Sequence, residues 1–282
     1  MSAQRKSFRL PWHPGSPPLI MGILNVTPDS FSDGGRFFNQ AAAIRQGQMF
    51  VEAGADLLDI GGESTRPGAR PVSLSEELKR TIPVISGLAR SVRVPLSIDT
   101  TKAEVARQAL QAGASLVNDV SALSADREMA RVAAKAKCGV ILMHMQGSPR
   151  TMQKRPRYRD VGREVLRFLE QAARKAQLAG IARKRIMIDP GFGFGKTLDH
   201  NVTLMRSLRT FVRTQYPVVI GPSRKSFIGK LTGAQVEDRL PGTLACVARA
   251  WLDGVAIVRV HDVAQTKQFL RLLAAIAPSG RI

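Results

Sequence analysis

The chain has 282 residues, of which 44% are hydrophobic and 23% are charged, a composition typical of a globular protein with one large domain or two small ones. It contains no apolar run of the roughly 18 residues that cross a membrane, no export signal at its N-terminus and no CxxC pair around its two cysteines, Cys138 and Cys246. We therefore expect a cytoplasmic protein with buried thiols, and its net charge of +20 requires nucleic acid to be considered as a partner.

Eight short apolar or β-branched runs follow one another along the chain, and segments of helical periodicity separate them. The nearly continuous apolar character of the runs is typical of parallel strands that are buried on both faces. The predicted strands are residues 19–26, 57–61, 94–98, 116–120, 139–143, 185–188, 218–220 and 255–260. The predicted helices are residues 41–53, 75–88, 103–112, 126–137, 159–179, 198–215, 243–252 and 263–277.

Eight strands that alternate with eight helices predict an α/β fold, a single-domain (β/α)8 TIM barrel, with a doubly wound sheet as the alternative. The barrel is expected to span residues 19–282, because no change of composition marks a second domain. Residues 1–18 are rich in proline and are expected to form a short N-terminal hairpin or extension over the barrel floor.

Residues that begin and end helices support this order of elements. Thr101 and Glu104 show the capping-box spacing that begins a helix. Glycines that suit a left-handed terminal residue follow three predicted helices, at Gly54, Gly113 and Gly254.

The basic residues are partly concentrated in the segment 150–185. Between residues 161 and 178 they alternate with apolar residues at helical spacing, which is typical of a solvated outer helix. Aromatic residues make up only 5% of the chain and form no interleaved stacking surface. We therefore expect no specific binding of nucleic acid, and favour a field that concentrates small anionic substrates.

Residues 21–35, MGILNVTPDSFSDGG, begin as an apolar strand and turn polar at Asn25. A buried strand that opens into a glycine-tipped loop is a common wall of an active site. Asp, Ser, Gly and Pro are also ordinary residues of a solvated turn. The ends of the other strands decide between these two interpretations.

In a (β/α)8 barrel the C-terminal ends of the strands carry the chemistry. Three predicted ends bear a carboxylate or an amide, at Asp99, Asn118 and Asp189, and such groups are costly to bury without a ligand. They suit a planar heterocycle with amide-like and amino edges, such as a pterin or a purine.

The last two strand ends bear side chains that suit phosphate oxygens, namely Lys225, Arg259 and His261. We therefore predict a heterocyclic substrate that carries a phosphate or pyrophosphate. Asn25 could supply one oxygen to a mostly hydrated Mg²⁺ that bridges a pyrophosphate. The run GFGFGK, residues 191–196, lacks the spacing of a phosphate-binding loop, and its Phe194 either faces an aromatic ligand or belongs to the core.

Taken together, nine motifs between residues 20 and 263 resemble the dihydropteroate synthase family in content and order. They are GILNVTPDSFSDGG (22–35), DIGGESTRPGA (59–69), SIDT (97–100), VNDVSA (117–122), MHMQGSPRTMQ (143–153), DPGFGFGK (189–196), GPSRKSFIG (221–229), RLPGTLA (239–245) and VRVHDV (258–263). Methyltransferases that act on methyltetrahydrofolate and a corrinoid share the Asp–Asn–Asp set, but that family is expected to lack the SRKS and RVHD strand ends, which are present here.

The resemblance implies the condensation of 6-hydroxymethyl-7,8-dihydropterin pyrophosphate with p-aminobenzoate in folate biosynthesis. It further implies a dissociative mechanism, a Mg²⁺ cofactor, a homodimer and inhibition by sulfonamides. By this resemblance the catalytic residues are Asp99, Lys225, Arg259 and Asp33. Asp99, Asn118, Asp189 and Lys225 would bind the pterin, Asn25, Arg259 and His261 the pyrophosphate, and Asn25 the metal. Thr65, Arg66, Pro67, Phe194, Ser223 and Arg224 would bind p-aminobenzoate.

Overall fold

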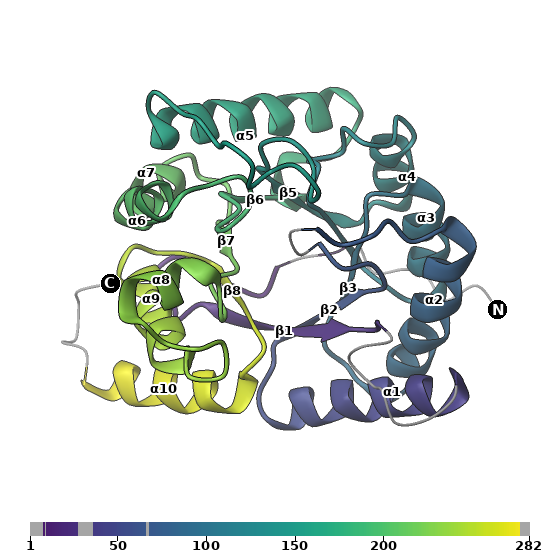
Figure 1. Ribbon diagram of the computed structural model, residues 1–282. Coiled ribbons are helices and arrows are strands. Elements are labelled where there is room, and N and C mark those ends of the chain that lie inside the picture. The colour runs from purple at the N-terminus through teal and green to yellow at the C-terminus, as the bar shows by residue number, and fades with distance from the viewer. Residues whose placement is uncertain (1–7, 9, 28–35, 66–67, 277–282) are drawn as a thin grey trace.

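The computed structural model describes residue 8 and residues 10–27, 36–65 and 68–276, and in them eight strands are enclosed by helices (Figure 1). The strands are β1 Leu19–Asn25, β2 Leu57–Gly61, β3 Leu96–Asp99, β4 Leu116–Asp119, β5 Gly139–Met143, β6 Ile186–Asp189, β7 Val219–Ile220 and β8 Ile257–Val260. The helices are α1 Arg36–Glu52, α2 Leu74–Ser91, α3 Ala103–Ala112, α4 Met129–Ala136, α5 Val161–Leu178, α6 Leu198–Arg206, α7 Leu208–Val212, α8 Ser226–Thr232, α9 Leu240–Leu252 and α10 Val263–Ile276.

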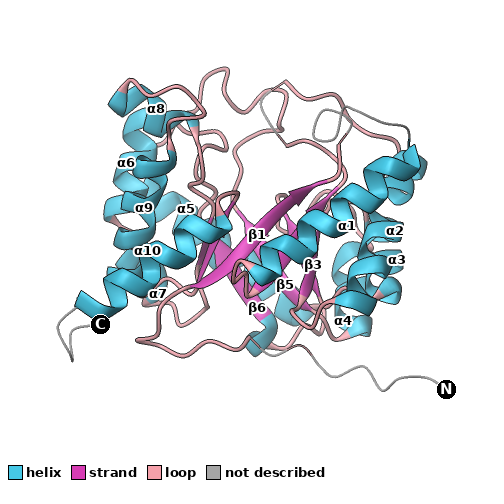
Figure 2. Ribbon diagram, turned by 90° about the horizontal axis from the view of Figure 1, so that it is seen from below, coloured by secondary structure: helices cyan, strands magenta, loops and turns pink. Residues whose placement is uncertain are grey.

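The strands form one parallel sheet, in the order β6-β5-β4-β3-β2-β1-β8-β7. Between β6 and β7 the sheet closes through a parallel bridge of Ile188 with Val218, and the N–H of Ile188 donates to the Pro217 carbonyl at 3.0 Å. The helices surround the strands in both views (Figures 1 and 2). The predicted (β/α)8 barrel is therefore confirmed, and the C-terminal strand ends meet at one end of it.

Only α3 has the limits predicted for it, and the larger differences concern four places. The predicted helix 198–215 is divided into α6 and α7 at Ser207, whose hydroxyl donates to the Thr203 carbonyl at 2.8 Å. The sequence does not predict α8, because seven residues that include Gly229 show too little periodicity. Helix α1 begins at Arg36 and α9 at Leu240, earlier than the predicted residues 41 and 243.

The capping box predicted at Thr101 and Glu104 is wrong. Helix α3 is preceded by Lys102, whose side chain makes no capping hydrogen bond. The N–H of Ala103 donates instead to Asp126 Oδ2 at 2.8 Å, so a side chain from the loop before α4 caps the helix. The three glycines predicted to end helices have positive φ angles, with values of 99° at Gly54, 122° at Gly113 and 82° at Gly254.

One apolar cluster joins residues from the strands to the segment that precedes β1. Phe8 is buried against side chains that the strands contribute, among them Met21, Leu57, Ile141 and Met187. The described part of residues 8–18 makes a turn at 14–15 and contains no strand. A hairpin over residues 1–18 and a domain boundary at residue 18 stay predictions, because residues 1–7 and 9 lie outside the described residues.

Helix α5 carries four of the basic residues of the segment 150–185, and its burial follows the predicted pattern. Val161, Val165 and Leu169 are buried, one helical turn apart, whereas Arg163 and Arg167 are exposed. The prediction of an outer helix with a solvated basic face is confirmed. Within the described part of the chain, no helix combines the length and the apolar character that spanning a membrane requires.

Candidate active site

Polar side chains of neighbouring strands meet at the C-terminal end of the barrel. The strand register pairs Asn25 with Gly61, Gly61 with Asp99, and Asp99 with Asn118. Because Gly61 has no side chain, the side chains beside it approach one another. A Cβ at Gly61 would lie 3.7 Å from Asp99 Oδ2 and 3.8 Å from Asn25 Oδ1. The structure thus brings together three of the predicted site residues.

Arg259 reaches from β8 into this group of side chains and binds two carboxylates. Its Nε donates to Asp59 Oδ2 at 2.6 Å, and its Nη2 donates to Asp99 Oδ2 at 3.0 Å. Asp59 Oδ2 also accepts Asn118 Nδ2 at 2.9 Å, which fixes the orientation of that amide. A connected network of charge-assisted hydrogen bonds therefore joins β2, β3, β4 and β8.

Asp59 is a residue of this network that the sequence prediction missed. It lies inside β2, two residues before Gly61, and is fully buried. Side chains two apart on a strand point to the same face, so its position within the DIGGES motif was a usable signal. The prediction considered strand ends alone and therefore passed over a carboxylate one step deeper in the barrel.

Burial controls the protonation of the network. Burial and the neighbouring Asp59 raise the pKa of Asp99 to about 7, against the opposing effect of Arg259. Burial would by itself lower the pKa of Arg259, but Asp59 and Asp99 raise it above its ordinary value. Arg259 is therefore a permanent cation, while Asp99 changes charge near neutral pH.

Asp189 ends β6 on another side of the same opening and is 6% exposed. Its Oδ1 accepts the N–H of Gly191 at 2.7 Å. Gly191 has a φ of 70°, and a Cβ there would lie 2.0 Å from the carbonyl oxygen of His144, so no larger residue fits. Burial raises the pKa of Asp189 to about 6, and the Gly191 N–H and three nearby cations oppose that rise.

Lys225 and Phe194 lie against each other. Lys225 Nζ is 4.0 Å from the centroid of the Phe194 ring, within the range of a cation–π interaction. Phe194 is 9% exposed and packs in a small apolar cluster with Val120, Met143 and Met152. Phe194 therefore packs in a core cluster, as one of its two interpretations predicts, and its contact with an aromatic ligand stays a prediction.

Three further predicted residues form pairs at the ends of β7 and β8. Ser223 Oγ lies 3.0 Å from His261 Nδ1 and accepts the N–H of His261 at 3.2 Å. Arg224 has a φ of 54°, which a non-glycine residue rarely adopts. The N–H of Arg224 donates to Thr243 Oγ1 at 3.1 Å, and its Nε donates to Asp262 Oδ2 at 3.0 Å. The residues predicted for p-aminobenzoate and for pyrophosphate are thus in direct contact.

Part of the prediction falls on residues that the structure does not describe. Asp33, predicted to be catalytic, and Arg66 and Pro67, predicted to bind p-aminobenzoate, lie outside the described residues. Thr65 is described and half-buried. Thr65, Arg66 and Pro67 lie on one loop, and the root of this loop is described as far as Thr65.

A partly buried ion-pair network holds the root of that loop. Lys102 Nζ bonds to the carboxylates of Glu63 and Glu77, and the Thr100 hydroxyl donates to Glu77 Oε1 at 2.6 Å. The Glu77 side chain is 1% exposed. Burial would lower the pKa of Lys102, but its hydrogen bonds to Glu63 and Glu77 raise it above the ordinary value. The network thus connects Glu63, at the root of the loop, to α2 and to Thr100, which follows β3.

We expect Lys102→Met to weaken the use of p-aminobenzoate more than that of the pterin substrate. The variant leaves the buried Glu77 without its cation, which costs about 3 kcal/mol of unfolding free energy, and releases the loop root. Steady-state kinetics should show the KM for p-aminobenzoate raised by about tenfold, equal to about 1.4 kcal/mol, with the KM for the pterin within about twofold. Lys79→Met, on the exposed face of α2, is the matched control. An equal rise in both KM values would contradict this positioning role.

The described residues contain no group of three or more His, Cys, Asp or Glu side chains that could hold a metal ion. A metal held mainly by the protein therefore does not fit the described site. A mostly hydrated Mg²⁺ needs only one or two protein oxygens together with those of a substrate phosphate. The half-buried Asn25, whose Oδ1 lies beside Gly61 at the strand ends, fits that lesser requirement.

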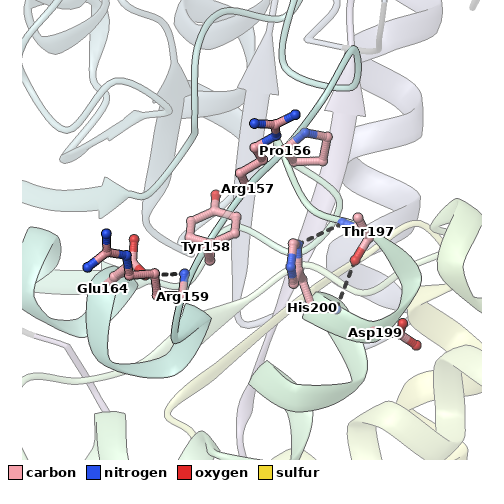
Figure 3. A pocket seen from close by; sticks show the side chains of 8 residues that line it. All are labelled: Pro156, Arg157, Tyr158, Arg159, Glu164, Thr197, Asp199 and His200. Carbon is pink, nitrogen blue, oxygen red and sulfur yellow. Dashed lines mark hydrogen bonds between the residues drawn. The ribbon is translucent and has the colours of Figure 1, made fainter.

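A separate hollow lies between the segment before α5 and the start of α6 (Figure 3). Pro156, Arg157, Tyr158, Arg159, Glu164, Thr197, Asp199 and His200 line it. None of these residues belongs to the predicted site. His200 and Thr197 form a reciprocal cap at the start of α6, with both hydrogen bonds at 3.2 Å. The polar groups of the hollow are thus partly used by the helix itself.

A parallel barrel whose strand ends combine buried carboxylates, an oriented amide and a buried arginine belongs to the class of enzymes that bind a flat polar heterocycle. The family described as pterin binding enzyme matches residues 21–261. The dihydropteroate synthase of Synechocystis is 49% identical over 93% of this chain and 91% of its own length. The chain belongs to the dihydropteroate synthase family, whose members are transferases of folate biosynthesis.

Solved structures agree with this assignment. The Xanthomonas albilineans dihydropteroate synthase with 4-aminobenzoic acid has a TM-score of 0.88 and 46% identity, over 94% of this chain and 95% of its own. The Yersinia pestis dihydropteroate synthase in a sulfonamide drug complex also has a TM-score of 0.88, with 43% identity over 98% of both chains. The similarity therefore covers the whole barrel.

Proposed function

We propose that this chain joins 6-hydroxymethyl-7,8-dihydropterin pyrophosphate to p-aminobenzoate by a dissociative substitution at the strand ends. The single observation that carries the proposal is the buried network of Asp99, Asn118 and Arg259, with Asp189 nearby at the same end of the barrel. Three acceptor groups and a fixed cation are costly to bury unless a polar ligand completes their hydrogen bonds.

The pterin is placed along the acidic strand ends. The carboxylate of Asp189 accepts two N–H groups from the amino and amide edge of the ring. Asn118 gives its Nδ2 to Asp59, so its carbonyl oxygen is oriented to accept a ring N–H. Asp99 bonds the opposite edge of the ring, and Lys225 lies over the side that carries N5 and O4. Four residues on four strand ends thus define one plane for the ring.

The pyrophosphate is placed toward Asn25, Arg259 and His261. Of the five N–H donors of a guanidinium, Arg259 uses two for Asp59 and Asp99 in the described contacts, which leaves donors for phosphate oxygens. Mg²⁺, with Asn25 as a ligand, would add positive charge that stabilises the departing pyrophosphate. Arg259 supplies the same kind of stabilisation from a fixed position.

The reaction breaks the bond between the pterin methylene carbon and the ester oxygen of the pyrophosphate group. The electron pair of this bond leaves with pyrophosphate. The carboxylate of Asp99 stabilises the resulting methylene cation, and Asp33 is proposed to do so as well. The p-aminobenzoate nitrogen then attacks the methylene carbon and loses a proton. No residue of the enzyme forms a covalent bond, so the site acts through positioning, charge and exclusion of water.

The p-aminobenzoate pocket is proposed to form from Thr65, Arg66, Pro67, Phe194, Ser223 and Arg224. The contact between Ser223 and His261 supports it, because it places this pocket beside the proposed pyrophosphate site, where the two substrates must meet. The Xanthomonas albilineans relative was solved with 4-aminobenzoic acid and the Yersinia pestis relative in a sulfonamide drug complex. We therefore propose that a sulfonamide competes with p-aminobenzoate here.

Pyrophosphate release is the experiment that tests this function. We expect release from the pterin substrate that needs Mg²⁺ and is faster with p-aminobenzoate, and in the presence of p-aminobenzoate it should yield dihydropteroate in equal amount. A sulfonamide should raise the apparent KM for p-aminobenzoate without changing kcat. No release under any of these conditions would exclude the proposed reaction, and inhibition that excess p-aminobenzoate fails to relieve would exclude the shared pocket.

We further propose a homodimer in the cytoplasm. Helices α8, α9 and α10 carry large exposed apolar side chains, at Leu231, Leu252, Leu272 and Ile276, and lie side by side in Figure 1. Large apolar side chains that are exposed on neighbouring helices support an interface with a second copy on this side of the barrel.

A further inference from the structure

Lys196 is a buried lysine that the mechanism above does not use. It ends the glycine-rich loop 191–196 and is 3% exposed. Its Nζ lies 3.0 Å from His144 Nδ1, 2.9 Å from the Phe194 carbonyl oxygen and 3.4 Å from the His144 carbonyl oxygen. An ammonium group has three N–H donors and no acceptor, so these three partners use all of its donors.

The contact determines the state of His144. When Lys196 is charged, its ammonium can only donate, so His144 Nδ1 accepts and the ring proton lies on Nε2. Burial and the charge of Lys196 lower the pKa of His144 to about 3, so the ring is neutral at physiological pH. The rings of Tyr158 and Phe168 pack against it, with centroids 6.0 and 4.9 Å away. Lys196 is therefore bound to a rigid acceptor.

The glycine-rich loop is held from several directions. Asp189 accepts the N–H of Gly191, and the other described side chains that bond to the loop, apart from Lys196, are neutral. Asn201 Oδ1 accepts the N–H of Gly193 at 2.7 Å, and Tyr158 donates to the Gly195 carbonyl at 2.8 Å. Tyr158 also lines the hollow of Figure 3, so it is the outer support of the loop. Lys196 is the inner support, and it alone among these residues brings a positive charge.

Lys196 is connected to Asp189 through His144. The main-chain N–H of His144 donates to the main-chain carbonyl of Asp189 at 3.0 Å, and the His144 side chain binds Lys196. Asp189 is faced by Lys225, Lys196 and Arg259, each of which lowers its pKa. Lys196 is faced by Asp189, which raises its pKa, and by Lys225, which lowers it; with burial the pKa is about 7. At pH 6 Lys196 is thus mostly charged while Asp189 titrates.

We propose that Lys196 is a positioning residue of the pterin site, which fixes the glycine-rich loop to His144 at the end of β5 and favours the ionised form of Asp189 through its buried positive charge. The inference rests on the proposed role of Asp189 in pterin binding. It explains why this loop ends in a buried lysine, although its main-chain groups could be satisfied by neutral side chains such as Asn201 and Tyr158.

The test is the pH dependence of binding of 6-hydroxymethylpterin, a pterin without the leaving group, measured by calorimetry between pH 5 and pH 8.5. Lys196→Gln removes the charge but keeps amide donors for the loop. We expect its affinity to match the wild type above pH 8, and the midpoint of its loss at low pH to rise by about one pH unit, which is about fivefold weaker binding at pH 6. Asp99 titrates in both proteins, so the comparison isolates Lys196.

Three controls accompany this variant. Lys184→Gln removes one charge from an exposed lysine and should leave the profile unchanged. Lys196→Met removes charge and donors together and should weaken binding at every pH. Since either Lys196 variant could unfold, thermal unfolding is measured in parallel. A folded Lys196→Gln protein with a wild-type profile would overturn the proposal.

An NMR titration reads the same coupling with Lys196 intact. One lysine side chain of the wild type should titrate near pH 7, and its midpoint should fall in Asp189→Asn because a facing anion is lost. Absence of such a signal, or a midpoint unchanged in Asp189→Asn, would overturn the inference. If the wild type instead binds no pterin at any pH while the lysine signal still responds to Asp189, the proposed function fails and the coupling stands.

Discussion

Arg259→Met is expected to destabilise the protein and to lower its activity more than any other change of a charged side chain at the strand ends. Arg259 lies between the fully buried Asp59 and the nearly buried Asp99. Its removal leaves two carboxylates close together without a cation, which costs about 3–5 kcal/mol of unfolding free energy. The loss of a fixed cation at the proposed leaving group should lower kcat by about 10²–10³.

The destabilisation should also depend on pH with a definite sign. Arg259 lowers the pKa of Asp99, so its removal raises that pKa above the value of about 7. A carboxyl whose pKa is higher in the folded state than in the unfolded state binds more protons when folded, and its contribution to stability falls as pH rises. In the wild type this loss is complete somewhat above pH 7, whereas in the variant it continues to higher pH. The deficit in unfolding free energy should therefore be larger at pH 8.5 than at pH 6.

Urea unfolding at those two pH values checks the expectation, and Arg249→Met is the matched control. Arg249 also pairs with a buried aspartate, Asp253, but Arg209 binds the other oxygen of that carboxylate at 2.9 Å. Its loss should cost about 1 kcal/mol or less, with no pH-dependent deficit above pH 6. If both arginine variants lose the same stability at both pH values, Arg259 has no special part in charge balance.

The sequence predicts the barrel well because its signals are local. A parallel strand buried on both faces is a short apolar run, and such runs predict β2 and β5 with their observed limits. Helix limits are less well predicted where a cap comes from elsewhere in the chain. Asp126 caps α3 from 23 residues away, and no spacing rule within α3 contains that information.

The residues of the site likewise divide into those that the sequence predicts and those that it does not. Asp99, Asn118 and Asp189 are predictable because each is a polar residue that follows an apolar run. Asp59 carries a signal in its strand position, but its role and that of Lys196 depend on a distant partner, namely Arg259 at a separation of 200 residues and His144 at 52. Their roles depend on burial and on pairing between distant strands, which only the closed barrel creates.

Asp189→Asn is the second change with a large expected effect, and it acts on binding. The amide has nearly the shape of the carboxylate and keeps an oxygen for the Gly191 N–H, so the fold should be retained. Toward the pterin it presents an NH₂ group where the ring also presents N–H donors. Two donors that face each other in a buried site leave both unpaired, and such a mismatch costs about 10³-fold or more in affinity.

Calorimetry with 6-hydroxymethylpterin measures this loss. The control is Asp199→Asn, which removes the carboxylate of an exposed aspartate of α6 and should leave the affinity for the pterin unchanged. The pH profile supplies a second criterion. Wild-type affinity should fall as pH decreases through about 6, because protonation of Asp189 removes an acceptor. The variant, weaker throughout, should lack that decrease, since it has no carboxylate at this position to titrate. An Asp189→Asn protein that binds the pterin with wild-type affinity would show that another strand end holds the amino edge of the ring, and Asp189 would then have to be reassigned to a structural role in the turn before Gly191.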